Sequence, residues 1–222
     1  FGINYMITAH GSDVLGHNNS RFKTLYKIVK PMWIKILTHA SFVTAPSMYL
    51  VNKIKESYGA LNVELIPNGI HLGEYRDAEK KKMLIVLTRL QKSKGVQKLI
   101  EACSEIDLNG WKIVILGDGP YKSQLEKMVK SKGLQDKIFF QGHVTGDERI
   151  KYLSEAGAFF SGSEFESFAV SVLEATIAKC NVIASDIEPH RGLVGEKHIF
   201  GTQKELESML KDVVRREPCE ID

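Results

Sequence analysis

The feature that most constrains the fold is a regular alternation of short apolar runs with helical patterns along the later part of the chain. Each run of β-favouring residues is followed by a segment with apolar residues at helical spacing. The predicted strands are 83–88, 111–116, 138–141, 158–161 and 182–185, and the predicted helices are 96–106, 121–131, 147–156, 168–179 and 204–215. This alternation predicts an α/β fold with a parallel sheet covered by helices on both faces. Ligands on such sheets bind beyond the carboxyl ends of the strands, so the loops after the strands are the candidate site.

The beginning of the chain repeats this pattern on a smaller scale. The predicted strands are 4–9, 41–45 and 63–67, and the predicted helices are 20–38 and 46–58. Pro31 predicts a break or kink in the first of these helices. The polar stretch 71–82 ends in Glu-Lys-Lys-Lys, a composition typical of a surface linker. We therefore expect two domains, residues 1–75 and residues 76–222.

Composition excludes several classes of protein. Of the 222 residues, 43% are hydrophobic and 26% are charged, and the formal net charge of +3 is too small for a protein that coats nucleic acid. The three cysteines, Cys103, Cys180 and Cys219, form no zinc or disulfide pattern, which indicates a reducing cytoplasm and no structural metal. No apolar stretch is long enough to cross a membrane. The start at Phe1 suggests a fragment, a processed chain or a truncated chain.

Two loops after predicted strands carry residues suited to a diphosphate. Arg89 and Lys94 lie between a strand and a helix, whose N-terminus adds free N–H groups and partial positive charge. The alternative is that both side chains only solvate a surface loop. Gly117 opens the next such loop, Gly-Asp-Gly-Pro, where glycine lets a ligand approach the backbone closely. Residue 122 is Lys, so the G-x-G-x-x-G dinucleotide fingerprint fails, and no P-loop motif occurs.

Two glutamates and one histidine are further candidates. Glu166 lies at the mouth of a predicted helix, and Glu174 lies eight residues further on, among apolar residues of that helix. A carboxylate in such a setting needs a partner, because an unpaired buried charge is costly. Paired ribose hydroxyls would serve, and the alternative is a salt bridge or an exposed helix edge. His10 follows a predicted strand, where it is either a structural residue or part of a site.

Several short motifs occur in a fixed order along the chain. They are His10-Gly11, Ile-Pro-Asn-Gly-Ile at 66–70, Arg89 with Lys94-Gly95, Gly-Asp-Gly-Pro at 117–120, Phe-Gln-Gly-His-Val at 140–144, Glu166 with Glu174, and Ala-Ser-Asp at 184–186. Each is common, but in this order they resemble the family-4-type, or group 1, glycosyltransferases of the GT-B fold. The resemblance implies two Rossmann-like domains facing across a cleft. Residues 83 to about 205 resemble the donor-binding C-terminal domain, and residues 1–70 resemble only the second half of the N-terminal, acceptor-side domain.

The resemblance also implies a role for each matching residue. Arg89 and Lys94 would neutralise the diphosphate of a nucleotide-sugar donor, and Glu174 would bind its ribose hydroxyls. Glu166 would contact the hydroxyls of the sugar, and His10 would lie near the transferred sugar. The backbone at six further residues would contact the nucleotide. They are Gly117, Gly142, His143, Val144, Phe168 and Ala169. The sequence departs from the family pattern at Thr88 and Ala169, where glycine is usual.

The chemistry of sugar transfer agrees with these assignments. Cleavage of the bond from the anomeric carbon to phosphate leaves negative charge on the nucleoside diphosphate, and the transition state resembles an oxocarbenium ion. The sequence contains no D-x-D motif, so we expect fixed cations rather than a metal to stabilise the leaving group, and we expect no cofactor. The resemblance implies retention of configuration. The alternatives are a donor-binding module that does not transfer sugar and a nucleotide-sugar 2-epimerase.

Residues 20–38 form a basic amphipathic stretch. They include five Lys or Arg residues and no Asp or Glu, interleaved with aromatic and apolar residues. Such a stretch could rest on an anionic membrane and bring a lipid-linked acceptor to the cleft. For a glycosyltransferase of this kind we expect a glycan or lipid-linked acceptor. The alternative is an ordinary domain helix with a solvated basic face.

Overall fold

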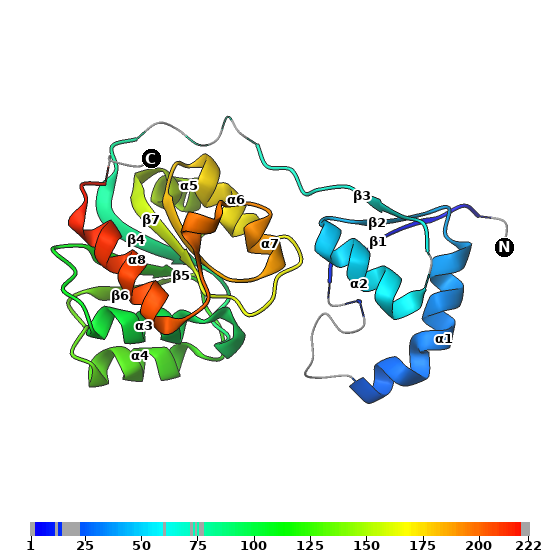
Figure 1. Ribbon diagram of the computed structural model, residues 1–222, viewed down its shortest axis with the longest axis horizontal. Helices are drawn as coiled ribbons and strands as arrows, with labels where there is room; N and C mark the ends of the chain where they lie inside the picture. Colours follow the sequence, from blue (N-terminus) through cyan, green and yellow to red (C-terminus); the bar gives the residue numbers. More distant parts are fainter. Residues whose placement is uncertain are drawn as a thin grey trace. The chain divides into compact units, whose positions relative to one another are not determined.

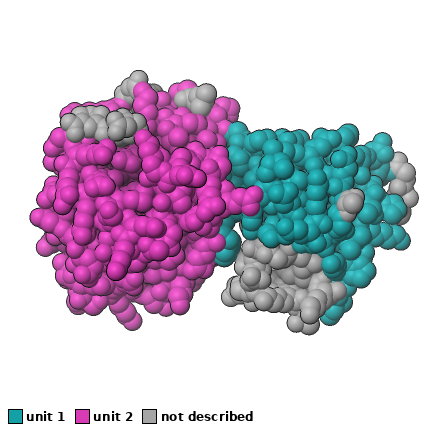
Figure 2. All heavy atoms as spheres, in the orientation of Figure 1, with its two compact units in different colours: residues 1–69, 165–168 teal, residues 70–164, 169–222 magenta. Residues whose placement is uncertain are grey.

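The computed structural model describes residues 3–11, 13–14, 23–59, 61–71, 73, 75 and 78–218, and for residues 23–27 it describes the backbone alone. The chain divides into two compact units, each with its own sheet (Figures 1 and 2). Unit 1 comprises residues 1–69 and 165–168, and unit 2 comprises residues 70–164 and 169–222. The main division lies at the start of the stretch for which the sequence predicts a linker.

Unit 1 has a three-stranded parallel sheet in the order β1-β2-β3. Its elements are β1 (Met6–Thr8), α1 (Lys23–His39), β2 (Phe42–Ala45), α2 (Met48–Tyr58) and β3 (Val63–Leu65). The core joins Val43 and Val63 of the sheet to Leu37 of α1 and to Leu50 and Ile54 of α2. The predicted alternation of strands and helices is therefore present in this unit.

The helix α1 runs through Pro31 without a break. Proline removes one backbone hydrogen bond from a helix interior. Trp33, Ile34 and Leu37 nevertheless pack against the core on the carboxyl side of Pro31, and this packing favours continuation of the helix. Of the predicted break or kink, the break is thus wrong, and the kink stays a prediction. The first residues of the basic stretch, 20–22, lie outside the described residues.

Unit 2 has a six-stranded sheet in the order β6-β5-β4-β7-β8-β9, with every pair parallel. Its strands are β4 (Lys81–Leu87), β5 (Lys112–Leu116), β6 (Ile138–Gly142), β7 (Ala156–Ser161), β8 (Asn181–Ser185) and β9 (Ile199–Phe200). The chain steps outward from β4 through β5 to β6, and then returns to place β7 on the other side of β4. The loops after β4 and β7 therefore flank the point at which the strand order reverses.

Helices cover both faces of this sheet, as the sequence predicts (Figure 1). They are α3 (Val96–Ser104), α4 (Lys122–Ser131), α5 (Gly146–Glu155), α6 (Val170–Ile177), α7 (Glu188–Arg191) and α8 (Gln203–Arg215). One core cluster contains Leu84 of β4 with apolar residues of α3, α4 and α8. The other contains Ile85, the next residue of β4, with apolar residues of α5 and α6. Successive strand residues point to opposite faces, so both faces are buried.

Besides the 3-10 helices Lys92–Lys94 and Glu196–His198, one short helix and one short strand are absent from the sequence-based prediction. They are α7 and β9, which lie between β8 and α8. A helix of 4 residues and a strand of 2 residues show too little periodicity to be recognised. The predicted helix 168–179 also begins later than expected, at Val170, because Ala169 has left-handed backbone angles. Within the described residues, no helix is long and apolar enough to cross a membrane.

Candidate functional site

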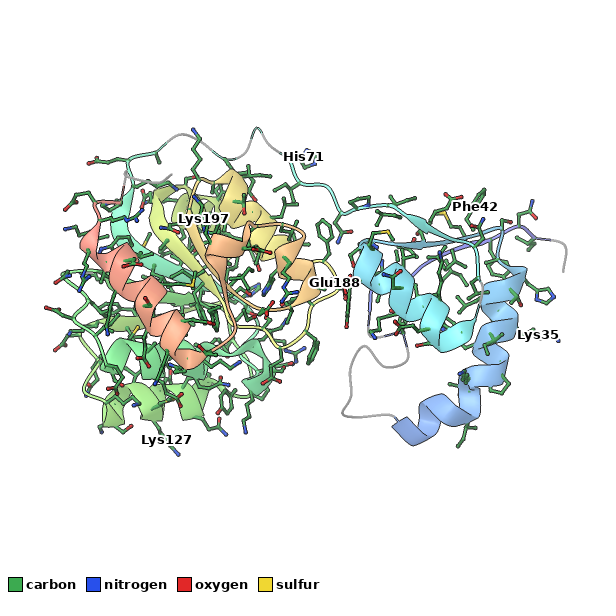
Figure 3. All side chains as sticks on the ribbon, viewed as in Figure 1. Lys35, Phe42, His71, Lys127, Glu188 and Lys197 are labelled. Atoms are coloured by element: carbon green, nitrogen blue, oxygen red, sulfur yellow. The ribbon has the colours of Figure 1, made fainter. Side chains whose placement is uncertain are left out.

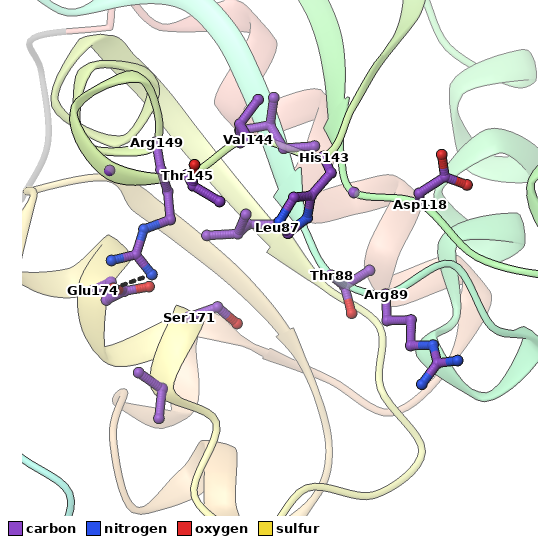
Figure 4. Close-up of a pocket in the computed structure, with 14 residues that line it drawn as sticks. Leu87, Thr88, Arg89, Asp118, His143, Val144, Thr145, Arg149, Ser171 and Glu174 are labelled. Atoms are coloured by element: carbon purple, nitrogen blue, oxygen red, sulfur yellow. Dashed lines mark ion pairs between the residues drawn. The ribbon is translucent and has the colours of Figure 1, made fainter.

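A cavity of about 610 Å³ lies at the carboxyl ends of the first three strands of unit 2 (Figure 4). Residues 87–89, 116–118 and 143–146 line it, together with Arg149 of α5 and Val170, Ser171 and Glu174 of α6. All of these residues belong to unit 2. The cavity lies where open α/β sheets bind ligands, and this is the edge that the sequence predicts.

Backbone hydrogen bonds connect the three loops that form the cavity wall. The N–H of Thr88 donates to Leu116 O at 3.0 Å, and the N–H of Leu90 donates to Asp118 O at 2.9 Å. The N–H of Gly117 donates to Gly142 O at 2.6 Å. These bonds extend the pairing of β4, β5 and β6 into their loops, so the loop backbone is fixed before any ligand arrives.

Arg89 supplies a positive charge at one end of the cavity. It is the second residue after β4 and is exposed, and no ion pair in the described part of the chain includes it. Its guanidinium points away from Glu174 (Figure 4). The charge is thus available to an anion, whereas the opposite end of the cavity carries Glu174.

The N-terminus of α6 also faces the cavity, through Val170 and Ser171. Its N-cap residue, Ala169, has φ 58° and ψ 55°, and no side chain caps this end of the helix. The first N–H groups of a helix have no acceptor within the helix, and they carry partial positive charge. This end of α6 therefore adds hydrogen-bond donors to the same cavity.

Glu174 is a buried carboxylate with two protein partners. Its side chain is 4% exposed, and its Oε1 lies 2.9 Å from Nη1 of Arg149. The same oxygen accepts a hydrogen bond of 2.9 Å from the hydroxyl of Tyr75. The sequence left a salt bridge and a hydroxyl-binding role open as alternatives. The structure contains the salt bridge and also places Glu174 in the cavity wall.

The segment that follows β6 forms another part of the wall. His143 and Val144 line the cavity, His143 being exposed and Val144 buried. Gly142 ends β6 with φ 77°, in the left-handed region that favours glycine. The turn after Gly142 directs the chain into α5, whose first turn includes Arg149.

Six predicted site residues are not in the cavity wall, and two of them, Gly142 and Ala169, are the immediate chain neighbours of wall residues. Lys94 is half-buried in the short 3-10 helix Lys92–Lys94 after Arg89. Glu166 and Phe168 belong to the segment 165–168, which groups with unit 1. His10 also belongs to unit 1, where it is exposed and its N–H donates to Asp13. Four side chains are predicted to hold the phosphates and sugars of the donor: Arg89, Lys94, Glu166 and Glu174. Of these, Arg89 and Glu174 line the cavity.

Arg149 and Tyr75 are site residues that the sequence analysis did not identify. Arg149 lies in the helix that follows the Phe-Gln-Gly-His-Val segment. Its position shortly after a predicted strand could have marked it as a candidate site residue. Tyr75 lies in the polar linker and carried no such signal. Among the described residues, no group of three or more His, Cys, Asp or Glu side chains forms a metal-ligand cluster.

Comparison with known protein families identifies the family of this chain. Residues 71–215 match the family described as "Glycosyl transferases group 1". The chain belongs to this family. The group 1 glycosyltransferase assignment agrees with the ordered motifs in the sequence, and the matched region contains every element of unit 2 from β4 to α8.

Curated relatives include glycosyltransferases with several substrates. One is an "Alpha-monoglucosyldiacylglycerol synthase" of Streptococcus pneumoniae, 24% identical over 78% of this chain and 45% of that protein. Another is a "GDP-mannose-dependent alpha-(1-6)-phosphatidylinositol monomannoside mannosyltransferase" of Mycobacterium tuberculosis, 29% identical over 65% of this chain and 43% of that protein. The group 1 chain thus spans less than half the length of these relatives.

Solved structures confirm the GT-B fold. TarM superposes with a TM-score of 0.79 at 21% identity, covering 95% of this chain and 43% of TarM. Anabaena HepE, solved in complex with UDP and glucose, superposes with a TM-score of 0.81 at 16% identity, covering 95% of this chain and 62% of HepE. The expectation of a group 1 glycosyltransferase with a GT-B fold is therefore confirmed.

Proposed function

We propose that this group 1 glycosyltransferase moves a sugar from a nucleotide-diphosphate sugar to an acceptor hydroxyl. The observation that carries the proposal is the cavity of unit 2. At one end it has Arg89, which forms no ion pair with any described residue, and at the other end it has the buried Glu174. A nucleoside diphosphate has matching chemistry, since it joins an anionic diphosphate to a ribose with two hydroxyls. The UDP bound in the HepE structure supports this choice of ligand class.

In this mechanism, fixed positive charge stabilises the leaving group. As the bond to the anomeric carbon breaks, Arg89 and the N–H groups of α6 interact with the growing charge on the diphosphate. Lys94 adds a second cation, and Phe168 and Ala169 lie in the chain just before those N–H groups. Glu166 and His10 contact the transferred sugar, and Gly117, Gly142, His143 and Val144 surround the nucleotide. Metal independence, retention of configuration and a cytoplasmic location belong to the same proposal.

The acceptor is proposed to be a glycan or a lipid-linked sugar. The names of the relatives from S. pneumoniae and M. tuberculosis, a glucosyldiacylglycerol synthase and a phosphatidylinositol monomannoside mannosyltransferase, support an acceptor of this kind. The helix α1 exposes Ile28 at 72% and Met32 at 59%, and Lys35 also projects from it (Figure 3). Exposed apolar residues on a basic helix suit peripheral contact with an anionic membrane. Co-sedimentation with anionic vesicles tests this contact, and equal binding by the wild type and an Ile28→Ser, Met32→Ser variant would refute it.

Titration calorimetry with UDP and GDP tests donor binding. We expect one of them to bind, and we expect Arg89→Ala to weaken its binding by about tenfold or more, as for a charge-assisted contact worth about 1.5–3 kcal/mol. The matched control is Lys92→Ala, which removes an exposed cation from the same loop. Failure of the wild-type chain to bind either diphosphate would overturn the proposal, and so would equal effects of the two substitutions.

A second candidate function is donor binding without transfer. The observation that favours it is the cavity itself, whose lining residues all belong to unit 2. Release of UDP from UDP-sugar in the presence of a lipid or glycan acceptor would exclude this candidate. Isomerisation of the sugar without release of UDP would instead indicate a 2-epimerase.

A further inference from the structure

Two side chains from different parts of unit 2 meet on one oxygen of Glu174. Nη1 of Arg149 lies 2.9 Å from Oε1, and the hydroxyl of Tyr75 donates to the same Oε1 at 2.9 Å. Arg149 is in the first turn of α5, Glu174 is in α6, and Tyr75 precedes β4. Neither Arg149 nor Tyr75 has a role in the function proposed above.

The second oxygen of this carboxylate has no partner among the residues that the structure describes. No hydrogen bond or ion pair among the described residues uses Oε2 of Glu174. The Glu174 side chain is only 4% exposed to solvent, and it lines the cavity. A carboxylate withdrawn from water is stabilised when its remaining acceptor positions are filled. Oε2 is therefore the position at which a ligand hydroxyl would complete the set.

The Arg149 guanidinium is held by the same contact. Its Nε is buried and has no acceptor in the described part of the chain, so the contact through Nη1 is its anchor. Arg149 also lines the cavity, where Figure 4 shows its guanidinium facing Glu174. Arg149 and Glu174 thus fix one another, and the positive charge offsets the charge of a carboxylate that is almost fully buried.

We propose that Arg149 and Tyr75 are positioning residues that hold Oε1 of Glu174 and thereby direct Oε2 to the hydroxyl pair of a ribose. This inference rests on the proposed function, in which Glu174 contacts the ribose. Two donors on one oxygen restrict rotation of the carboxylate, because any intermediate orientation breaks both contacts, and a half-turn only exchanges two equivalent oxygens and restores the same arrangement. The pair therefore determines how strongly the site distinguishes a ribonucleotide from its deoxy analogue.

The test is the ratio of the dissociation constants of 2′,3′-dideoxy-UDP and UDP, or of the GDP pair if GDP is the better ligand. We expect the wild type to prefer the ribonucleotide by about tenfold or more, as expected for hydrogen bonds to a charged group. Glu174→Gln should reduce this ratio markedly. Arg149→Gln and Tyr75→Phe should also reduce it by several fold, and Arg149→Lys should restore part of it.

The matched controls are Lys151→Gln, an exposed cation on the same helix as Arg149, and Glu148→Gln, an exposed carboxylate on that helix. Both should retain the wild-type ratio. If Arg149→Gln and Tyr75→Phe weaken both nucleotides equally and keep the ratio, the positioning role is wrong. If Arg149→Gln does not fold, Tyr75→Phe decides, because it removes a single hydroxyl. If the wild type binds no nucleotide, the proposed function itself fails.

Discussion

Gly117 lies so close to the backbone of Thr88 that a Cβ on residue 117 would be 1.9 Å from the carbonyl oxygen of Thr88. Its φ of 140° is also a value that side-chain-bearing residues rarely adopt. The sequence suggested that this glycine makes room for a ligand. The structure adds a second reason, because the loops after β4 and β5 pack together at this residue.

Replacing Gly117 with alanine should destabilise the protein strongly. The added methyl group must displace backbone, so we expect a loss of about 3 kcal/mol or more in the free energy of unfolding. The shift would also move Arg89, so nucleotide affinity should fall as well. Urea unfolding measures the first effect. Gly110→Ala is the control, because Gly110 has φ 81° and nothing within 4 Å of the added Cβ, so only about 1 kcal/mol is expected. Equal losses would show that the close approach is not rigid.

Two residues at the ends of α6 have left-handed backbone angles and should respond differently to glycine. Lys179 is exposed and has φ 58°, so Lys179→Gly should stabilise the protein by about 1 kcal/mol. Ala169 also has φ 58°, but it is 7% exposed and its methyl group packs in the core. Losing that methyl costs about 0.8 kcal/mol, so Ala169→Gly should be nearly neutral. Thermal unfolding of both variants tests this, and equal stabilisation would refute it.

The two described cysteines should be unreactive in the folded protein. Burial raises the pKa of the Cys103 thiol to about 12 and that of Cys180 to about 11. In a Cys219→Ser background, iodoacetamide at pH 8 should label neither thiol without denaturant and both in urea, because the thiolate is the reactive form. Labelling of either cysteine in the native protein at the rate seen in urea would contradict the prediction.

These raised pKa values also fix a pH dependence. Folding favours the protonated thiols. Their contribution to the free energy of unfolding is therefore complete below the pKa of the unfolded state, near 9.0, and it declines as the pH rises above that value. Cys180→Ala should therefore reduce the fall in the free energy of unfolding between pH 8 and pH 10.5. An unchanged fall in that variant would argue against the raised pKa of Cys180.

The capping box at the start of α8 should give a pH dependence of the opposite sign. Glu205 accepts hydrogen bonds from the N–H groups of Gly201 at 2.7 Å and Thr202 at 2.8 Å, and these lower its pKa. A lowered pKa stabilises the fold above the unfolded value of 4.5, and this contribution is lost as the pH falls through the folded value. Glu205→Gln should therefore cost stability at pH 7 but much less at pH 3.

Two further variants separate the cap from general charge effects. Thr202→Ala removes the hydroxyl that accepts from the Glu205 N–H at 3.2 Å, so it should cost about 1 kcal/mol at both pH values. Glu207→Gln, which lies on the same helix outside the capping box, should change little. Chemical denaturation at pH 7 and pH 3 measures all three variants. A loss for Glu205→Gln that does not depend on pH would contradict the role of its carboxylate.

The sequence by itself determined the strands and helices of unit 2 and the edge of the sheet at which a site forms. Apolar periodicity is a local property, and a parallel sheet places all post-strand loops at one edge. This is why Arg89 and Gly117 could be assigned to post-strand loops at one edge of the sheet, whereas His143 and the ligand role of Glu174 were indicated by the resemblance to the family. The short elements α7 and β9 escaped recognition because each contains only about one period of its pattern.

Only the tertiary structure decided which side chains contact Glu174. Tyr75 and Glu174 are 99 residues apart, and Arg149 reaches Glu174 from the helix before β7. The strand order β6-β5-β4-β7 brings these residues together, and no local pattern encodes that order. A salt bridge depends on distances of a few ångströms between side chains. Such distances are set by the packing of α5 and α6 on the sheet, so the residue spacing alone could identify the carboxylate but not its partners.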